Sequence, residues 1–195
     1  MRLKMNKILI FFYISFSISI AQRPITSEDI VNLKTVSQAS FHPDGSKIVY
    51  IKSIPSAKDG DKVSSFKEIW VIKSNGKDQK KYTSSSSSIR SPQWTPKGDI
   101  SYLSRNKDFD KNTQIYTIPI DGGEPSILTS HDQGIISYKW SPDGKWIAFT
   151  SKDAISEKRR KEISDGYDMI VMGEEKLFTR LWIYSLKNNS IELLF

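Results

Sequence analysis

The chain has no cysteine and only two histidines among its 195 residues. The absence of cysteine excludes disulfides, cysteine-ligated zinc and the lipid anchor that bacterial lipoproteins carry on a cysteine. The two histidines are distant in sequence and no paired-carboxylate motif accompanies them, so the ligand spacing of a zinc or calcium site is not met. We therefore expect no metal and no cofactor. Stability has to come from apolar burial, which suits a large domain better than a small secreted one.

A long apolar run is also missing, because the stretch from Ile8 to Ile20 contains three serines and falls short of the about 20 residues that span a bilayer. Basic residues precede this stretch and the small Ala21 follows it. Such an order is typical of a secretory signal peptide rather than a membrane anchor. We predict a cleaved signal over residues 1–21, a periplasmic or secreted bacterial protein, and no membrane contact after cleavage.

The net charge of +7 falls once this signal is removed. Three of the 29 basic residues lie in it, which leaves 26 basic against 22 acidic residues and a net charge of +4. That charge and the predicted export argue against a nucleic-acid partner. With 37% hydrophobic and 26% charged residues, the composition is that of an ordinary globular protein.

One motif occurs three times, over residues 39–50, 92–102 and 138–149. In each copy an aromatic residue ends a short strand, a Pro-x-Gly turn follows, and an alternating β-branched or aromatic strand leaves the turn. Proline presets φ for the first central turn position, and glycine tolerates the left-handed conformation before the next strand. The motif prolines Pro43, Pro96 and Pro142 lie 53 and 46 residues apart. This period is typical of propeller blades or a related array.

A second strand pattern follows each hairpin, over residues 68–72, 114–118 and 180–184, and a polar turn and a final short strand come after it. Four strands therefore recur three times. We predict an all-β fold, a partial β-propeller of about three four-stranded antiparallel blades, roughly 36–83, 89–129 and 135–195, within a domain of residues 22–195. Dense apolar runs such as 48–51 and 146–149 suit strands covered on both faces. A β-sandwich is the less favoured alternative, because two distinct motifs recur in order.

Three further segments have local predictions. A short helix should begin after the N-cap Thr26, before the first blade. The serine run from Ser84 to Ser88 is expected to form a flexible loop. The third repeat carries an insertion that includes the charged residues 157–162. Because a propeller closes with about four to eight blades, we expect this chain to be a fragment of a longer protein.

The opening residues 25–30, the Pro-Asp-Gly hairpins and the segment from Gly173 to Trp182 together resemble the N-terminal propeller region of bacterial prolyl oligopeptidase-family serine peptidases. The resemblance is to the acylaminoacyl-peptidase and dipeptidyl-peptidase branch and covers nearly all of residues 22–195; TolB-like propellers share the hairpin motif. It implies a parent enzyme in which the propeller gates access to a C-terminal α/β-hydrolase domain with a Ser-Asp-His triad. That domain, absent from this chain, and a peptide substrate would be the partners.

The sequence offers no catalytic residues of its own. The Gly-x-Ser-x-Gly turn that exposes an α/β-hydrolase nucleophile does not occur. A triad also needs a histidine as its base. His42 occupies a hairpin turn position, and His131 lies in a polar segment between blades, where we expect a solvated side chain.

The candidate substrate-binding residues are Glu174 and Glu175. Dipeptidyl peptidases of the family hold the free amino terminus of the substrate with propeller carboxylates, so the resemblance implies this role for an adjacent acidic pair. Other polar groups have structural interpretations: the segment from Asp108 to Asn112 is a polar hairpin loop, 158–161 is a solvated basic run flanked by glutamates, and 188–190 is a turn.

The resulting hypothesis is the substrate-gating propeller segment of an exported serine exopeptidase that hydrolyses oligopeptides. The alternative is a stand-alone TolB-like periplasmic propeller that binds a protein or peptide. A propeller lyase or glycan-active protein is a third possibility, and it would need ligands that this sequence does not contain.

Overall fold

The computed structural model describes residues 23–55, 65–86, 88–105, 112–167 and 177–195. The chain divides into two compact units, Met1–Asn32 and Leu33–Phe195. The predicted signal segment 1–21 lies outside the described residues. Within the described part, no helix has the length and apolar character needed to cross a membrane.

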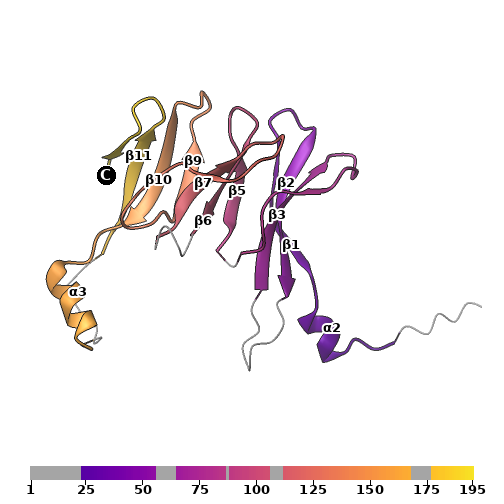
Figure 1. The fold of residues 1–195 in the computed structure, drawn as a ribbon, viewed down its shortest axis with the longest axis horizontal. Helices are drawn as coiled ribbons and strands as arrows, with labels where there is room; N and C mark the ends of the chain where they lie inside the picture. The colour runs from indigo at the N-terminus through magenta and orange to yellow at the C-terminus, as the bar shows by residue number, and fades with distance from the viewer. Residues whose placement is uncertain (1–22, 56–64, 87, 106–111, 168–176) are drawn as a thin grey trace, which may run out of the picture. The chain divides into compact units, whose positions relative to one another are not determined.

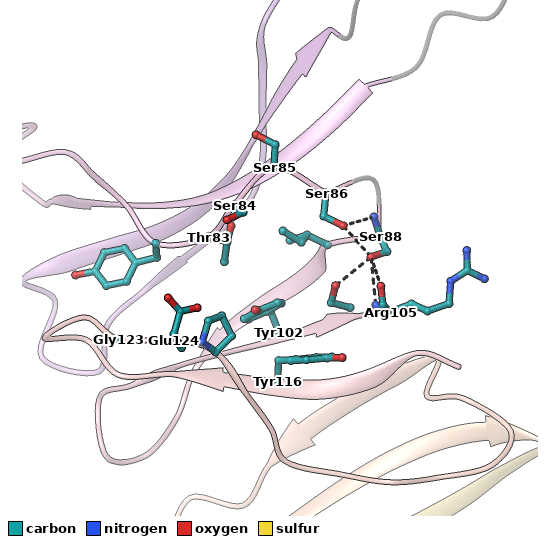
Figure 2. A pocket seen from close by; sticks show the side chains of 14 residues that line it. Thr83, Ser84, Ser85, Ser86, Ser88, Tyr102, Arg105, Tyr116, Gly123 and Glu124 are labelled. Carbon is teal, nitrogen blue, oxygen red and sulfur yellow. Dashed lines mark hydrogen bonds between the residues drawn. The ribbon is translucent and has the colours of Figure 1, made fainter. Parts of the chain in front are cut away.

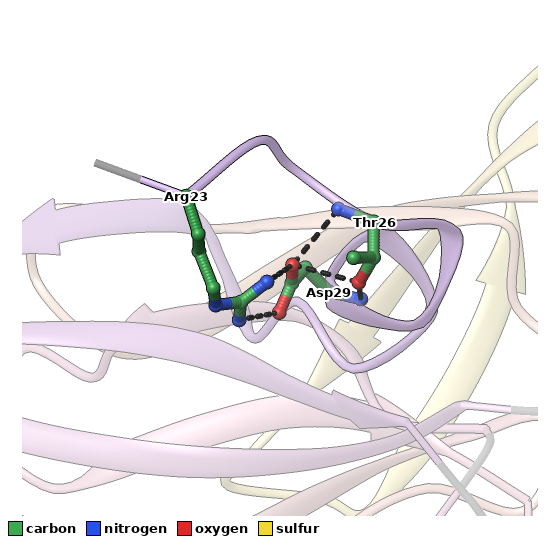
Figure 3. A network of polar contacts seen from close by, with 3 residues as sticks. All are labelled: Arg23, Thr26 and Asp29. Carbon is green, nitrogen blue, oxygen red and sulfur yellow. Dashed lines mark hydrogen bonds and ion pairs between the residues drawn. The ribbon is translucent and has the colours of Figure 1, made fainter. Parts of the chain in front are cut away.

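The described residues of the first unit include one short helix, α2 (Ser27–Val31), as predicted. Thr26 is its N-cap: the Thr26 hydroxyl accepts from the Asp29 N–H at 3.2 Å, and the Asp29 carboxylate accepts from the Thr26 N–H at 2.9 Å. Two hydrogen bonds of 2.6 and 2.5 Å join the Arg23 guanidinium to the same carboxylate (Figure 3). The Arg23 hydrogen bonds and those from Thr26 lower the pKa of Asp29. This capping box satisfies backbone groups at the start of α2.

The second unit is built from three four-stranded antiparallel sheets, in agreement with the predicted repeat. The first sheet contains β1 (Thr35–Phe41), β2 (Lys47–Pro55), β3 (Ser65–Lys73) and β4 (Lys80–Lys81). The second contains β5 (Arg90–Trp94), β6 (Ile100–Ser104), β7 (Gln114–Ile118) and β8 (Ser126–Ile127). The third contains β9 (Ser137–Trp140), β10 (Trp146–Lys152), β11 (Thr179–Ser185) and β12 (Ser190–Leu193). In each sheet neighbouring strands are consecutive in sequence, and Figure 1 shows the second sheet between the other two.

The Pro-x-Gly turns have nearly the same geometry in all three sheets. The turn glycines donate to the carbonyls of His42, Thr95 and Ser141 at 2.8, 2.9 and 3.0 Å. Their φ angles are +73° at Gly45, +90° at Gly98 and +69° at Gly144. A left-handed residue is therefore required at this position, as the sequence motif predicts.

Successive turns also touch one another, which the motif alone does not indicate. A Cβ added at Gly98 would lie 2.9 Å from Nε2 of His42 in the preceding turn, and a Cβ at Gly144 would lie 3.2 Å from the Cβ of Pro96. At Gly45, in the first turn, no atom lies within 4 Å of such a Cβ. The second and third glycines therefore permit a close approach between sheets as well as a left-handed φ.

Two apolar cores lie between the sheets. One is shared by the first and second sheets and is centred on fully buried residues such as Ile51, Ile69 and Ile100. The other is shared by the second and third sheets and includes Leu103 and Phe149. Because side chains alternate along a strand, β6 and β7 of the second sheet supply both cores, Ile100 and Tyr116 on one face and Leu103 and Ile115 on the other.

Tryptophans of the hairpin motif connect the sheets by hydrogen bonds. Trp94 Nε1 donates to the Ser40 carbonyl in β1 at 3.0 Å. Trp140 Nε1 donates to the Ser101 hydroxyl in β6 at 2.8 Å. Phe41 holds the same motif position in the first sheet, but it is 64% exposed.

The prediction that both dense apolar runs are covered on two faces is right for only one of them. In β2, Val49, Tyr50 and Ile51 are all buried. In β10, Phe149 is buried while Trp146 is 40% exposed. The strand alternates because only one face of the third sheet packs against another sheet among the described residues.

The insertion in the third repeat forms α3 (Glu157–Ser164), between β10 and β11. Its N-cap, Ser156, accepts from the Arg159 N–H at 3.1 Å. None of its residues is buried. The predicted solvated basic run is confirmed, and Glu162 lies 3.3 Å from the Arg159 guanidinium and 3.9 Å from Lys158 Nζ.

The turn contacts predict different costs for the same substitution. Gly45→Ala should destabilise the protein by about 1–2 kcal/mol, the cost of a left-handed L-residue. Gly98→Ala should cost about 1 kcal/mol more, because the new methyl group displaces the His42 ring from Trp94. Urea unfolding followed by tryptophan fluorescence measures both. In a His42→Ala background the additional cost at Gly98 should disappear; if it persists, the turn contact is not its cause.

The Ser101 contact makes a second prediction. Ser101→Ala removes the acceptor of Trp140 Nε1 and of the buried Tyr138 hydroxyl, and it should lower the free energy of unfolding by about 1–3 kcal/mol because these donors lose their partner. Ser137→Ala, which removes an exposed hydroxyl pair with Thr150, is the matched control and should cost under about 0.5 kcal/mol. Equal effects in urea titrations would contradict the assignment.

Candidate functional site

The two sequence-predicted binding residues, Glu174 and Glu175, lie outside the described residues, and their role stays a prediction. The described ends of the same insertion meet at Asp153. Its carboxylate accepts from the Phe178 N–H at 3.0 Å and from Arg180 Nε at 2.9 Å, and its own N–H donates to the Phe178 carbonyl at 2.8 Å. The Arg180 hydrogen bond holds the pKa of Asp153 below its ordinary value. This contact fixes the two ends of the insertion against each other.

His42 is a turn residue, as predicted. Its Nδ1 lies 2.6 Å from the Asp44 carboxylate, which also accepts from the Ser46 N–H at 2.7 Å. The Ser46 hydrogen bonds, aided by His42, lower the pKa of Asp44 to about 2. The imidazole ring meets Trp94 edge-on, with 4.7 Å between ring centroids.

The prediction of a solvated His131 is wrong. Its ring is half-buried and packs against Phe149 and Trp182, with centroid distances of 5.1 and 4.7 Å. Burial lowers the pKa of His131. The side chain belongs to the packing of the third sheet, which brings the segment before β9 against β10 and β11.

Of the other polar candidates, Asn112 and Asn189 make structural contacts. Asp108 and Asp110 lie outside the described residues, and the Asn112 side chain donates to the Asp132 carbonyl. The predicted turn at 188–190 joins β11 to β12, and Asn189 accepts from the Tyr184 hydroxyl at 3.0 Å. Over the described ranges, no group of three or more His, Asp or Glu side chains is arranged to hold a metal ion.

A pocket of about 690 Å³ lies between the second sheet and the segment that links it to the first sheet (Figure 2). One wall is the connection after β4, which contains the serine run. The opposite wall comes from β6, β7 and the turn before β8. The lining residues are 82–86, 88–89, Tyr102, Ser104, Arg105, Tyr116 and 123–125. Its volume falls within the roughly 300–1,000 Å³ of small-molecule sites.

The serine wall is fixed by a buried carboxylate, so the prediction of a flexible loop there is wrong for the described serines. Glu68, in β3, accepts from the Ser85 hydroxyl at 2.7 Å, from Trp70 Nε1 at 2.9 Å and from Lys81 Nζ at 3.2 Å. Ser86 pairs with Lys67 through two backbone hydrogen bonds of 2.9 and 3.0 Å. This segment is therefore held along the edge of β3.

The same arrangement recurs at the next connection. Gln114 in β7 occupies the position of Glu68, and its side chain bonds both the N–H and the carbonyl of His131 at 3.1 and 2.8 Å. A threonine hydroxyl two residues before the held residue accepts a strand N–H in both cases, at Thr83 and at Thr129. We call this repeated contact the blade latch, Glu68–Ser85 in the first sheet and Gln114–His131 in the second.

Ser88 connects the serine wall to the second sheet. Its hydroxyl lies 3.0 Å from the hydroxyls of both Ser86 and Ser104, and the Arg105 N–H donates to it at 3.2 Å. Tyr102 and Tyr116 form the floor as a cross-strand stacked pair, with 5.7 Å between centroids. Burial raises the pKa of Tyr102, so its phenol stays protonated.

The sequence analysis does not predict this pocket, because it expects the serine run from Ser84 to Ser88 to be a flexible loop and not a fixed wall. The signal that could have found it is Glu68, an acid within the otherwise apolar strand of residues 68–72. A buried acid needs hydrogen-bond donors, and the nearby serines supply one.

No protein-family profile matches the chain. Among curated proteins, it is 27% identical over 150 residues to the uncharacterized peptidase YuxL of Bacillus subtilis, covering 75% of this chain and 22% of that protein. It is 30% identical over 145 residues to dipeptidyl-peptidase 5 of Porphyromonas gingivalis, covering 74% of this chain and 20% of that protein. These relatives are peptidases. The predicted resemblance to peptidases is confirmed, and the chain spans about a fifth of the length of these relatives.

Solved structures confirm the β-propeller fold. The apo AtxE2 isopeptidase matches with a TM-score of 0.64 and 15% identity over 88% of this chain and 32% of that chain. Acylaminoacyl peptidase of Pyrococcus horikoshii matches with a TM-score of 0.60 and 12% identity over 84% and 25%. The β-propeller domain of the Trilobed protease from Pyrococcus furiosus matches with a TM-score of 0.51 and 13% identity, over 83% of this chain and 42% of that chain. TolB from Acinetobacter baumannii matches with a TM-score of 0.51 and 20% identity, over 80% of this chain and 31% of that chain.

The blade latch predicts an acid-sensitive contribution to stability. Because hydrogen bonds from Ser85, Trp70 and Lys81 outweigh desolvation, the pKa of Glu68 is lowered. Stability from Glu68 is therefore fully present above the ordinary glutamate pKa of about 4.3 and is lost as the pH falls through the lower folded value.

Glu68→Gln should lower the free energy of unfolding by about 1–3 kcal/mol at pH 7, because the amide turns a donor toward either Trp70 Nε1 or the Ser85 and Lys81 pair. Urea unfolding at pH 3 and pH 7 should show a smaller pH difference in the variant than in the parent. Glu124→Gln, which alters an exposed carboxylate, is the control. An unchanged pH difference in Glu68→Gln would refute the latch.

Proposed function

We propose that this chain is the substrate-gating propeller segment of an exported serine exopeptidase that hydrolyses oligopeptides. The observation that carries the proposal is the similarity to two peptidases over three quarters of the chain, one of them a dipeptidyl-peptidase. In this proposal the hydrolysis takes place in an α/β-hydrolase domain outside the present sequence. That assignment is consistent with the absence of a Gly-x-Ser-x-Gly turn from these 195 residues.

The propeller would act by shaping the route of the substrate to the catalytic domain. Neighbouring sheets pack through apolar cores, so a peptide cannot pass through these cores without breaking their contacts. In this proposal the packed sheets exclude folded proteins and admit short chains. We place the protein in the periplasm or outside a bacterial cell, on the basis of the signal-like residues 1–21.

Within this proposal, Glu174 and Glu175 bind the free amino terminus of the peptide. Two adjacent carboxylates can accept charge-assisted hydrogen bonds from an ammonium group. The Asp153–Arg180 ion pair, with 2.9 Å between Arg180 Nε and Asp153 Oδ1, ties the insertion that carries the acidic pair to the ends of β10 and β11. Holding both ends of the insertion reduces the entropy lost when the acids engage a ligand.

A stand-alone TolB-like propeller that binds a protein or peptide partner is the second candidate. The match to TolB of Acinetobacter baumannii, over 80% of this chain, favours it to a lesser degree. In this case the parent protein would have no hydrolase domain.

The two candidates are distinguished by the full-length protein. We expect its gene to encode a Gly-x-Ser-x-Gly serine after residue 195 and the purified protein to cleave a chromogenic dipeptide substrate. Replacing that serine with alanine should abolish cleavage. Replacing Glu174 and Glu175 with glutamine should raise KM for a free-amino dipeptide about tenfold or more, with less effect on an N-acylated substrate. A reading frame without a hydrolase domain would overturn the peptidase proposal and leave the TolB-like one.

A further inference from the structure

The pocket between the second sheet and the segment that links it to the first sheet contains polar groups that the fold itself does not use. Among its lining residues, the side chains of Ser84, Tyr102, Arg105 and Glu124 make no hydrogen bond or ion pair within the described part of the chain. The other serine and threonine hydroxyls of the wall take part in the contacts of Glu68, Ser88 and the strand N–H groups. These four side chains supply two hydroxyls, one anion and one cation.

The two hydroxyls are held by a fixed frame. Ser84 stands between Thr83, which is buried and accepts the Ile69 N–H at 2.9 Å, and Ser85, which is bonded to Glu68. Tyr102 is 4% exposed and stacked on Tyr116. Hydroxyls that are already oriented lose little conformational entropy when a ligand arrives.

The two charges lie at opposite ends of the pocket. Figure 2 shows Glu124 beside the turn that precedes β8, and Arg105 at the other end, beyond Ser88, with its guanidinium turned outward at the rim. Neither charge has an opposite charge of the protein as a partner in the described residues. A ligand that fits this pattern has an ammonium group at one end and a carboxylate that the flexible Arg105 side chain can meet at the other.

The aromatic residues of the floor do not offer a stacking surface for a sugar ring. Tyr102 and Tyr116 lie against each other with an interplanar angle of 22°, and they are only 4% and 7% exposed. What Tyr102 presents is its hydroxyl. Hydroxyls on both walls suit the amide groups of a peptide backbone, which need donors as well as acceptors.

We infer that this pocket is a binding site for a short peptide with both termini free, separate from the acidic pair at 174–175. The Glu124 carboxylate accepts from the peptide ammonium group, the Ser84 and Tyr102 hydroxyls bond its amides, and Arg105 meets its carboxylate. The inference rests on the proposed peptide specificity for its biological meaning, but the binding itself does not depend on hydrolysis.

The test uses the full-length protein that carries this chain and the dipeptide glycyl-sarcosine, whose N-methylated bond resists hydrolysis. Isothermal titration calorimetry at peptide concentrations up to roughly 10 mM covers the weak affinities of such ligands. Glu124→Gln should weaken binding about tenfold or more. Asp121→Asn, which removes an exposed acid from the same turn without touching the pocket, should leave it within about twofold.

Modified ligands assign the two ends. N-acetylation of the peptide should weaken binding to the parent protein but cause no further loss in Glu124→Gln, because both changes remove one contact. Amidation of the peptide carboxylate should weaken binding to the parent protein more than it weakens binding to Arg105→Gln. Lys97→Gln, which removes an exposed cation outside the pocket, is the control and should respond to amidation as the parent does. Binding that is unaffected by Glu124→Gln, or equal losses in Glu124→Gln and Asp121→Asn, would overturn the inference.

Failure here and failure of the proposed function give different results. Glu124-dependent binding in a protein without peptidase activity would support the pocket and refute the peptidase. Peptidase activity with binding that is insensitive to Glu124 would support the peptidase and refute the pocket. Circular dichroism melting of each variant checks that a loss of binding is not a loss of folding.

Discussion

The structure depends on contacts made by one sheet with the hairpin of the next. Each four-stranded sheet is too thin to bury its apolar residues alone, so the sheets must pack face to face. Trp94 and Trp140 hydrogen-bond backward into the preceding sheet, to Ser40 and Ser101, and the turn glycines allow adjacent turns to touch. The cores between sheets follow from this spacing.

The connections between sheets have a second recurring contact, the blade latch. A polar side chain inside an apolar strand, Glu68 or Gln114, bonds the segment that leads to the next sheet. Burying such a group has a desolvation cost that only a full set of hydrogen bonds offsets. The latch holds in place the serine segment that forms one wall of the pocket, and within the described residues the Ser84 side chain makes no hydrogen bond there.

The peptidase relatives and the propeller fold fit together if, as we propose, the propeller controls which peptides reach a separate catalytic domain. The exposed apolar residues of the outer sheets, such as Val36 and Phe41 in β1 and Leu193 in β12, accord with the expectation of further blades. In that arrangement the recognition of peptide termini would be distributed between the insertion of the third sheet and the pocket near the first. Both would use carboxylates for the amino terminus, since charge-assisted hydrogen bonds give the strongest discrimination against acylated peptides.

The sequence by itself determined the four-strand repeat, the hairpin turns and the capped helix at Thr26, because periodicity, turn residues and caps act over a few neighbouring positions. It did not determine which side chains of each repeat are buried against a neighbouring sheet. The same motif position is exposed at Phe41 and buried at Trp94, and Trp146 is exposed although its strand is apolar. His131 and the serine run were misjudged for the same reason. The partner of His131 is Trp182, which is distant in sequence, and the partner of the serine run is Glu68, which lies in an otherwise apolar strand. Only tertiary packing brings these residues together.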